Sequence, residues 1–283
     1  MYTTLISAEE VAQHLKETHW RLVDCRFALM NPEQGAEDYQ VSHVPGAVYA
    51  HMNADLSAPV VPGQTGRHPL PEIEHLVHLF SHWGIDRSVQ VVAYDDFHGG
   101  MAARLWWLLR WLGHEQVAVL DGGWRQWKAL NLPINDEVTY PEPRVFIPEI
   151  QSHLIIDTAF ISQNLPMASW CLVDSRERER YLGLHEPIDP VAGHIPGAKN
   201  YPYLDNLDGN TWKSAAEFRR RFAPLHDHYT ADQTAFYCGS GVTACHNVLA
   251  YTHAGYGFPK LYPGSWSEWI TDQGRPVNTS SEG

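Results

Sequence analysis

The chain contains the same series of motifs twice, and this internal repeat limits the folds it can adopt more than any other feature. The first half carries WRLVDCR (Trp20 to Arg26) and then HVPGA (His43 to Ala47). The second half carries WCLVDSR (Trp170 to Arg176) and then HIPGA (His194 to Ala198). The aspartates of the first motif are 150 residues apart and the histidines of the second motif 151. Such constant spacing indicates a tandem duplication.

Two later motifs continue the repeat. VVAYD (Val91 to Asp95) corresponds to TAFYC (Thr234 to Cys238), and LDGGWRQW (Leu120 to Trp127) corresponds to LYPGSWSEW (Leu261 to Trp269). The separation between the copies falls to 143 and then 142 residues, a change that small deletions in surface loops explain. Each copy is therefore predicted to be one domain.

A proline-bearing segment lies between the copies. Residues 138–151 include Pro141, Pro143 and Pro148, which disfavour both helix and central strand and are typical of an extended linker. The sequence predicts an N-terminal domain over 1–137, a linker over 138–151 and a C-terminal domain over 152–283. A chain of 283 residues is long enough for two such domains.

Short apolar runs alternate with longer helical patterns in each copy. The expected strands are Arg21 to Val23, Gln90 to Tyr94, Val117 to Leu120, Cys171 to Val173 and Ala235 to Tyr237. The expected helices include Ser7 to Glu17, where Ser7 and Glu10 have capping-box spacing, and Gly100 to Gly113. This alternation predicts an α/β fold in which each domain is a parallel sheet flanked by helices. Functional loops are then expected after Tyr94 and Tyr237, beyond the carboxyl ends of strands.

Composition excludes several classes of protein. Acidic residues outnumber basic ones by 33 to 20, for a formal net charge of −13, so nucleic acid is not an expected partner. The longest apolar stretch, Met101 to Gly113, is interrupted by Arg104 and Arg110 and is too short for a membrane helix. The N-terminal residues lack the pattern of a secretory signal, and four cysteines are too few for a disulfide scaffold, so a cytoplasmic location is expected. The cysteines also lack the paired spacing of a zinc site.

The loop after Tyr237 has the composition of an anion-binding turn. Gly239 and Gly241 allow successive backbone N–H groups to point at the sulfur of Cys238, and a helix is expected to begin near Val242 or Thr243. The positive end of that helix adds about 0.3–2 kcal/mol in favour of a negative charge. Both effects favour the nucleophilic thiolate over the thiol. The alternative is a small buried hydrophobic residue at a strand end.

The second cysteine of this region, Cys245, is expected to lie on the helix among apolar residues. A disulfide with Cys238 is an alternative, but a structural role for Cys245 is favoured.

At this point the sequence resembles a known family, the tandem-domain sulfurtransferases called rhodaneses, and within it the 3-mercaptopyruvate sulfurtransferase type. The resemblance covers nearly the whole chain and rests on the paired LVDxR and H(V/I)PGA motifs, on DGGW and PGSW, and on the loop CGSGVTAC. It implies two rhodanese-like domains, of which only the C-terminal one is catalytic. Asp95 stands where Cys238 stands in the second copy, which agrees with a non-catalytic first domain.

The resemblance also implies a reaction. Cys238 would take a sulfane sulfur from 3-mercaptopyruvate or thiosulfate, become a persulfide, and pass the sulfur to a thiol or cyanide, with a thioredoxin-like reductant as a further candidate partner. No metal or organic cofactor is implied. For mercaptopyruvate the family uses a Ser–His–Asp relay, which in this sequence matches Ser240, His68 and Asp55.

The residues that would bind the donor are carried over in the same way. The loop residues Gly239, Gly241, Val242 and Thr243 and the arginine Arg180 match the family's positions. A second arginine of the family is absent, because its alternative positions hold Ile188 and Asp189. Thiosulfate enzymes of the family carry basic residues directly after the cysteine, where this chain has Gly239 and Ser240. Neither donor is fully matched, and mercaptopyruvate is favoured.

Two other arginines lie in the segment SRERERY. Arg176, Arg178 and Arg180 would share one face if this segment were extended. Arg176 repeats Arg26 and is expected to stabilise the fold through Asp174 or a backbone carbonyl, whereas Arg178 is interpreted as solvated.

Two rival functions were considered from the sequence. A cysteine phosphatase needs an arginine six residues after its cysteine, and this chain has Ala244 there, which excludes that class. A non-catalytic binding module built from tandem rhodanese domains stays as the alternative to an enzyme.

Overall fold

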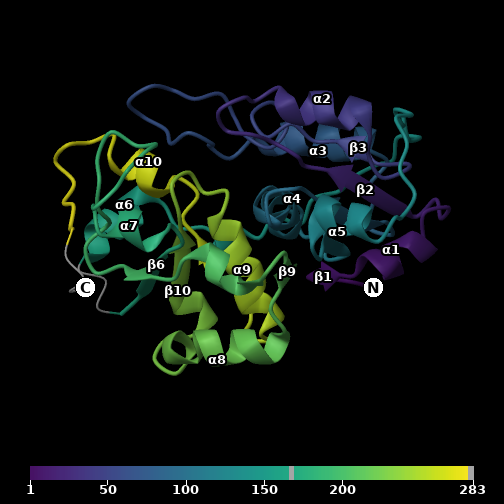
Figure 1. The fold of residues 1–283 in the computed structure, drawn as a ribbon. Helices are drawn as coiled ribbons and strands as arrows, with labels where there is room; N and C mark the ends of the chain where they lie inside the picture. Colours follow the sequence, from purple (N-terminus) through teal and green to yellow (C-terminus); the bar gives the residue numbers. More distant parts are fainter. Residues whose placement is uncertain (166–168, 280–283) are drawn as a thin grey trace. The chain divides into compact units, whose positions relative to one another are not determined.

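The computed structural model describes residues 1–165 and 169–279, and these form two compact units (Figure 1). The first unit comprises Met1–Ala58, Leu70–Gln151 and Gly209–Trp212. The second comprises the described residues of Pro59–Pro69, Ser152–Asp208 and Lys213–Gly283. The short segment Pro59–Pro69 thus belongs to the second unit although it lies near the middle of the first copy in the chain.

The first unit is built on a five-stranded sheet in the order β1-β5-β4-β2-β3, with all neighbouring strands parallel. Its strands are β1 (Leu5–Ile6), β2 (Trp20–Asp24), β3 (Val48–Tyr49), β4 (Gln90–Tyr94) and β5 (Val117–Leu120). Its helices are α1 (Ala8–Gln13), α2 (Gln34–Val41), α3 (Ile73–His82), α4 (Gly100–Trp111) and α5 (Gly123–Ala129).

The second unit repeats this plan with a parallel sheet in the order β11-β10-β6-β7. Its strands are β6 (Cys171–Asp174), β7 (Lys199–Asn200), β10 (Thr234–Tyr237) and β11 (Lys260–Leu261). The short strands β8 (Leu207–Asp208) and β9 (Thr211–Trp212) pair with each other outside both larger sheets, and β9 is assigned to the first unit. The helices are α6 (Thr158–Asn164), α7 (Arg178–Tyr181), α8 (Ala215–His226), α9 (Ala244–His253) and α10 (Ser265–Trp269). The expected α/β fold, with parallel sheets flanked by helices, is confirmed.

The five predicted strands are all present because each is apolar on both faces and lies fully inside a sheet. Every residue of β4, β5, β6 and β10 is buried. The predicted helix over 100–113 is α4, and Gly113, at φ 83°, follows its end. The helix predicted over 7–17 is shorter: Ser7 caps α1 by accepting the N–H of Glu10 at 3.2 Å, but α1 ends at Gln13.

A buried arginine links each sheet to the last helix of its unit. In the first unit, Arg26 donates to Asp24 and to the carbonyl of Ser42, and its guanidinium lies 4.8 Å from the ring centre of Trp124. In the second unit, the same contacts run from Arg176 to Asp174, to the carbonyl of Gly193, and to Trp266 at 4.7 Å. These contacts confirm the structural role predicted for Arg176. They fix α10, which lies directly beside the Cys238 loop.

The proline-bearing segment before the second unit has neither helix nor strand. The N–H of Glu149 donates to the carbonyl of Leu112 at 2.8 Å, and the ring of Phe146 contacts that of Phe80 edge-on. The segment is therefore extended and bound along the first unit. None of the described helices is long and apolar enough to cross a membrane.

Candidate active site

Cys238 follows the last residue of β10, in the loop that leads into α9. Its side chain is almost completely buried, and the N–H of Gly241 donates to its Sγ at 3.2 Å. Gly241 has φ 78°, and a Cβ there would lie 2.2 Å from the carbonyl oxygen of Pro263. Only glycine fits this turn, so the turn that directs an amide at the sulfur depends on the glycine. The helix begins at Ala244, close to the predicted start.

Ser265, at the start of α10, positions the backbone of Cys238, and the sequence analysis missed it. Its Oγ accepts the N–H of Cys238 at 3.1 Å and donates to the carbonyl of Tyr262 at 2.9 Å. Ser265 adopts φ 56°, in the left-handed region that a non-glycine residue seldom occupies. The corresponding residue of the first copy is Gly123, at φ 54°. The difference between PGSW and DGGW was the available signal.

Two members of the predicted relay lie together in the second unit. Nδ1 of His68 is 2.8 Å from Oγ of Ser240, and both side chains are buried. His68 comes from the segment Pro59–Pro69, which is part of this unit. Asp55 belongs to the first unit, where its carboxylate accepts the N–H of His51 at 2.7 Å and where burial raises its pKa. The relay through Asp55 stays a prediction.

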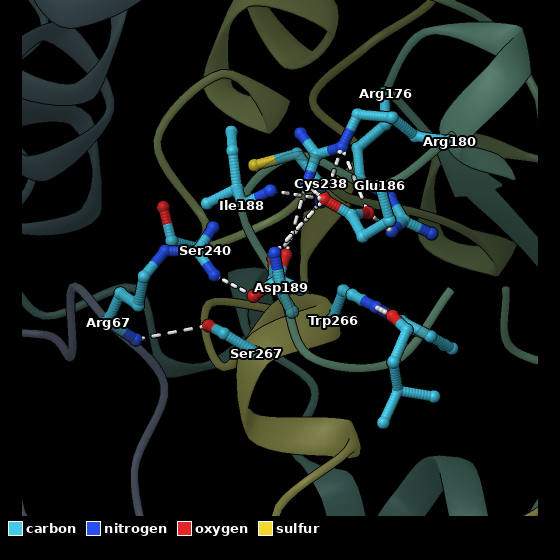
Figure 2. A network of polar contacts seen from close by, with 12 residues as sticks. Arg67, Arg176, Arg180, Glu186, Ile188, Asp189, Cys238, Ser240, Trp266 and Ser267 are labelled. Carbon is cyan, nitrogen blue, oxygen red and sulfur yellow. Dashed lines mark hydrogen bonds and ion pairs between the residues drawn. The ribbon is translucent and has the colours of Figure 1, made fainter. Parts of the chain in front are cut away.

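Arg180 lies beside the loop within a network of ion pairs (Figure 2). It donates to Glu186 at 3.0 Å through Nε and to Asp189 at 3.0 Å through Nη2. Asp189, which occupies a position where an arginine was expected, also accepts a bond from Nη1 of Arg67. Arg67 is a functional candidate that the sequence analysis missed; its one signal was the position directly before His68.

Both guanidinium groups approach the loop at the residue after the cysteine. A Cβ on Gly239 would lie 2.7 Å from Nη2 of Arg67 and 3.4 Å from Nη2 of Arg180. Burial lowers the pKa of Arg67, and the nearby Cys238 opposes this shift. The loop itself lacks basic residues, but guanidinium groups from two other segments lie beside Gly239.

The segment with three alternating arginines is not extended. Arg178 and Arg180 lie in the short helix α7, so the condition for a shared face, an extended segment, is not met. Two residues along a helix are separated by a turn of about 200°. Arg178 is exposed, as predicted, whereas Arg180 turns toward the network described above.

The four cysteines, Cys25, Cys171, Cys238 and Cys245, are free and buried. Cys245 lies on α9 and its thiol donates to the carbonyl of Gly241, which confirms the structural role and excludes the alternative disulfide. Within residues 1–165 and 169–279, no group of three His, Cys, Asp or Glu side chains is arranged to hold a metal ion.

Comparison with known proteins identifies the family. The model of the Rhodanese-like domain matches residues 7–130 and again 160–272. The chain belongs to the rhodanese family. It is 46% identical to a "Probable 3-mercaptopyruvate sulfurtransferase" of Pseudomonas aeruginosa, over 97% of this chain and 98% of that protein. The resemblance recognised in the sequence is therefore confirmed.

Two further relatives carry the two donor names. The rhodanese-family "Thiosulfate sulfurtransferase" of Mus musculus is 33% identical over 95% of this chain and 93% of its own length. The structure of "3-mercaptopyruvate sulfurtransferase from Leishmania major" superposes with a TM-score of 0.83 at 32% identity, covering 94% of this chain and 74% of that one.

In the first rhodanese unit the equivalent loop is filled by its own side chain. The carboxylate of Asp95 accepts four backbone N–H groups at 2.8 Å each, from Phe97, Gly99, Met101 and Ala102. The amides that would otherwise face a bound anion are thus already bonded. The turn of the first unit is therefore closed around a carboxylate instead of a thiol.

The pH dependence of stability reports on this carboxylate. Burial raises the pKa of Asp95 from 3.8 to about 6, although the backbone N–H bonds oppose the shift. Between these values the folded chain keeps a proton that the unfolded chain has lost. The free energy of unfolding therefore decreases as the pH rises from about 4 to about 6, by up to ~3 kcal/mol from this group.

Asp95→Asn should remove that part of the pH dependence. Urea unfolding followed by tryptophan fluorescence at several pH values between 4 and 7 compares the variant with the wild type. A difference in unfolding free energy that stays constant over this range contradicts the raised pKa. Sulfur transfer by the variant should stay within about twofold of the wild type, because Asp95 belongs to the first unit and not to the unit that carries Cys238.

Proposed function

We propose that this rhodanese transfers a sulfane sulfur from 3-mercaptopyruvate to a thiol or cyanide acceptor through a persulfide on Cys238. The observation that carries the proposal is that Cys238, which accepts the Gly241 N–H, shares its loop with Ser240, whose Oγ lies 2.8 Å from Nδ1 of His68. The 46% identical relative is named for the same donor. The second unit is the proposed catalytic domain and the first its non-catalytic partner.

In the first half-reaction, the thiolate of Cys238 attacks the sulfur of the donor. A sulfur–sulfur bond forms, the carbon–sulfur bond of 3-mercaptopyruvate breaks, and its electron pair passes to the pyruvate enolate. The thiol proton of the donor ends on the enolate carbon, which gives pyruvate. The enzyme is left with the persulfide anion of Cys238.

The proton transfer is the proposed task of Ser240 and His68. Their separation of 2.8 Å allows a proton to pass between the hydroxyl and the imidazole. Asp55 is the proposed third member, which would orient the imidazole. Its carboxylate role follows the general logic of a Ser–His–Asp relay.

In the second half-reaction, an acceptor thiolate or cyanide attacks the outer sulfur of the persulfide. The new bond forms to the acceptor, the sulfur–sulfur bond breaks, and the Cys238 thiolate returns. The proposed binding residues are Arg180 and the loop amides of Gly239, Gly241, Val242 and Thr243, which would stabilise the negative charge in both states.

The wider setting is part of the proposal. A thioredoxin-like dithiol is proposed as one acceptor, and the cytoplasm as the compartment, since the four cysteines are free rather than paired. The reaction as written balances without a metal or organic cofactor.

Thiosulfate is the second candidate donor. The guanidinium groups of Arg67 and Arg180 beside Gly239 supply positive charge that the loop sequence lacks, and charge of this kind suits a dianion. The mouse relative named for thiosulfate also matches nearly the whole chain.

Incubation of the purified protein with each donor tests the function. Mass spectrometry should find one added sulfur atom on Cys238 after 3-mercaptopyruvate, and kcat/KM with cyanide as acceptor should be higher for this donor than for thiosulfate. A higher value for thiosulfate would replace the donor. A protein without a sulfur adduct from either donor would be the non-catalytic binding module.

A further inference from the structure

The position of Asp189 raises the question of what binds the donor carboxylate besides Arg180. A planar guanidinium fork matches a carboxylate, and the sequence offers only one arginine at the expected positions. In the structure, Asp189 is 2% exposed and lies between two guanidinium groups, with Oδ1 bonded to Arg67 and Oδ2 to Arg180 (Figure 2). A second arginine is therefore present in space, although it comes from a different segment.

Arg67 is held in place from both ends. Its backbone N–H donates to Oγ of Ser267 at 3.0 Å, and a Cβ on the preceding Gly66 would lie 2.6 Å from the carbonyl oxygen of Gly264. The segment therefore packs directly onto the start of α10. The ion pair with Asp189 fixes the far end of the side chain.

The guanidinium of Arg67 keeps donors available beside the loop. Arginine has five N–H donors, and Asp189 takes one of them through Nη1. Nε is buried and has no hydrogen-bond partner among the described residues, while the side chain as a whole is 28% exposed. Nη2 is the nearest atom to the Cβ position of Gly239, next to Cys238. A buried N–H without a partner is costly, and an anion at the loop would satisfy it.

The ion pairs of the network hold the guanidinium groups of Arg67 and Arg180 in place. Three arginines, Arg67, Arg176 and Arg180, pair with four carboxylates, Asp174, Glu177, Glu186 and Asp189. The pair of Arg176 and Asp174 stabilises the fold, as described above. Asp189 therefore acts as the counter-ion that keeps Arg67 and Arg180 aligned side by side at the loop.

Building on the function proposed above, we propose that Arg67 supplies the second guanidinium that binds the carboxylate of the donor. Arg67 acts with Arg180. It supplies the guanidinium that the chain lacks at position 189, where it has Asp189. The substrate class is thereby an α-keto acid whose carboxylate lies at Gly239 while its thiol reaches Cys238.

A comparison of a charged and an uncharged donor tests the role of Arg67. Kinetics are measured with 3-mercaptopyruvate and with its carboxamide, 3-mercaptopyruvamide, for the wild type and for Arg67→Gln. The variant should raise KM for the carboxylate about 10- to 100-fold, as expected for a lost charge-assisted hydrogen bond, and leave the amide within about threefold. The KM of Arg67→Lys for the carboxylate donor should fall between those of the wild type and Arg67→Gln, because lysine keeps the charge without the planar fork.

The control is Arg178→Gln, which removes an exposed arginine of α7. It should leave KM and kcat unchanged for both donors. A structural role for Arg67, or a role in stabilising the thiolate, would lower the rates with both donors equally. That result would overturn the proposal.

A binding measurement separates this inference from the proposed function. Calorimetric titration of pyruvate into a Cys238→Ser protein needs no sulfur transfer, and Arg67→Gln in that background should weaken binding about tenfold. Equal binding in the two proteins would overturn the role of Arg67. Absence of turnover of 3-mercaptopyruvate by the wild type would instead overturn the proposed donor. The comparison of pyruvate binding would still test the role of Arg67 in carboxylate binding.

Discussion

Replacing Cys238 by serine is expected to abolish sulfur transfer, with a loss on the order of 10⁶ in kcat, the scale seen when a covalent nucleophile is removed. The serine hydroxyl stays protonated at neutral pH, so it does not attack the donor sulfur. The change exchanges the sulfur of the side chain for oxygen and keeps the side chain nearly the same size. The N–H of Gly241 can still donate to the new oxygen, so folding should be preserved.

Cys171→Ser is the matched control. Cys171 is also a buried free cysteine of the second unit, at the start of β6, and burial raises its pKa to about 11, so it is a thiol at neutral pH. Steady-state rates and the mass of the sulfur-loaded protein are measured for both variants. Retained transfer by Cys238→Ser, or loss in Cys171→Ser with unchanged circular dichroism, would remove Cys238 from its role.

The features that could be predicted from the sequence are those written in short local patterns. β4 and β10 were predicted to the residue or nearly so because a strand buried on both faces is a continuous apolar run. Cys238 could be identified because the glycines that shape its turn are its near neighbours in the chain. Gly241, at φ 78° and packed against Pro263, shows that the turn requires glycine for a physical reason.

The features that could not be predicted depend on contacts between distant segments. Arg67 precedes Gly239 by most of the chain. The two come together because the segment of Arg67 packs onto the start of α10, through Gly66 against Gly264 and the Arg67 N–H bond to Ser267. The sequence therefore indicated a missing arginine where the structure has one from another segment. An alignment of motif positions compares residues along the chain and does not detect such a replacement in space.

Ser265 and Asp95 show a second limit, which concerns hydrogen bonds to the backbone. The Oγ of Ser265 accepts the N–H of Cys238, and the carboxylate of Asp95 accepts four N–H groups of its own loop and of the first turn of α4. Backbone donors are identical in every residue, so the sequence does not show which side chain will bond to them. Asp95 was visible in the sequence as the counterpart of Cys238, but its hydrogen bonds to four backbone N–H groups were not.

Ser240→Ala is expected to lower kcat with 3-mercaptopyruvate by about 10²-fold, the usual contribution of a positioned proton-transfer group. The pyruvate enolate needs a proton as it leaves, and Ser240 is the group that lies 2.8 Å from His68. With thiosulfate the leaving group is sulfite, which departs as a stable anion. The same variant should therefore lose less than about threefold with thiosulfate, because no proton transfer is removed. Steady-state kinetics with both donors measures the difference.

His68→Gln gives the companion measurement, since glutamine can still hydrogen-bond to Ser240 but does not transfer a proton. Two groups that act as one relay are not additive, so the double variant should be no slower with 3-mercaptopyruvate than the slower single variant. Ser175→Ala is the control for a buried serine of the same unit, whose Oγ accepts a bond from Asn247. Equal losses with the two donors, or losses that multiply in the double variant, would show that Ser240 and His68 do not form the proton relay.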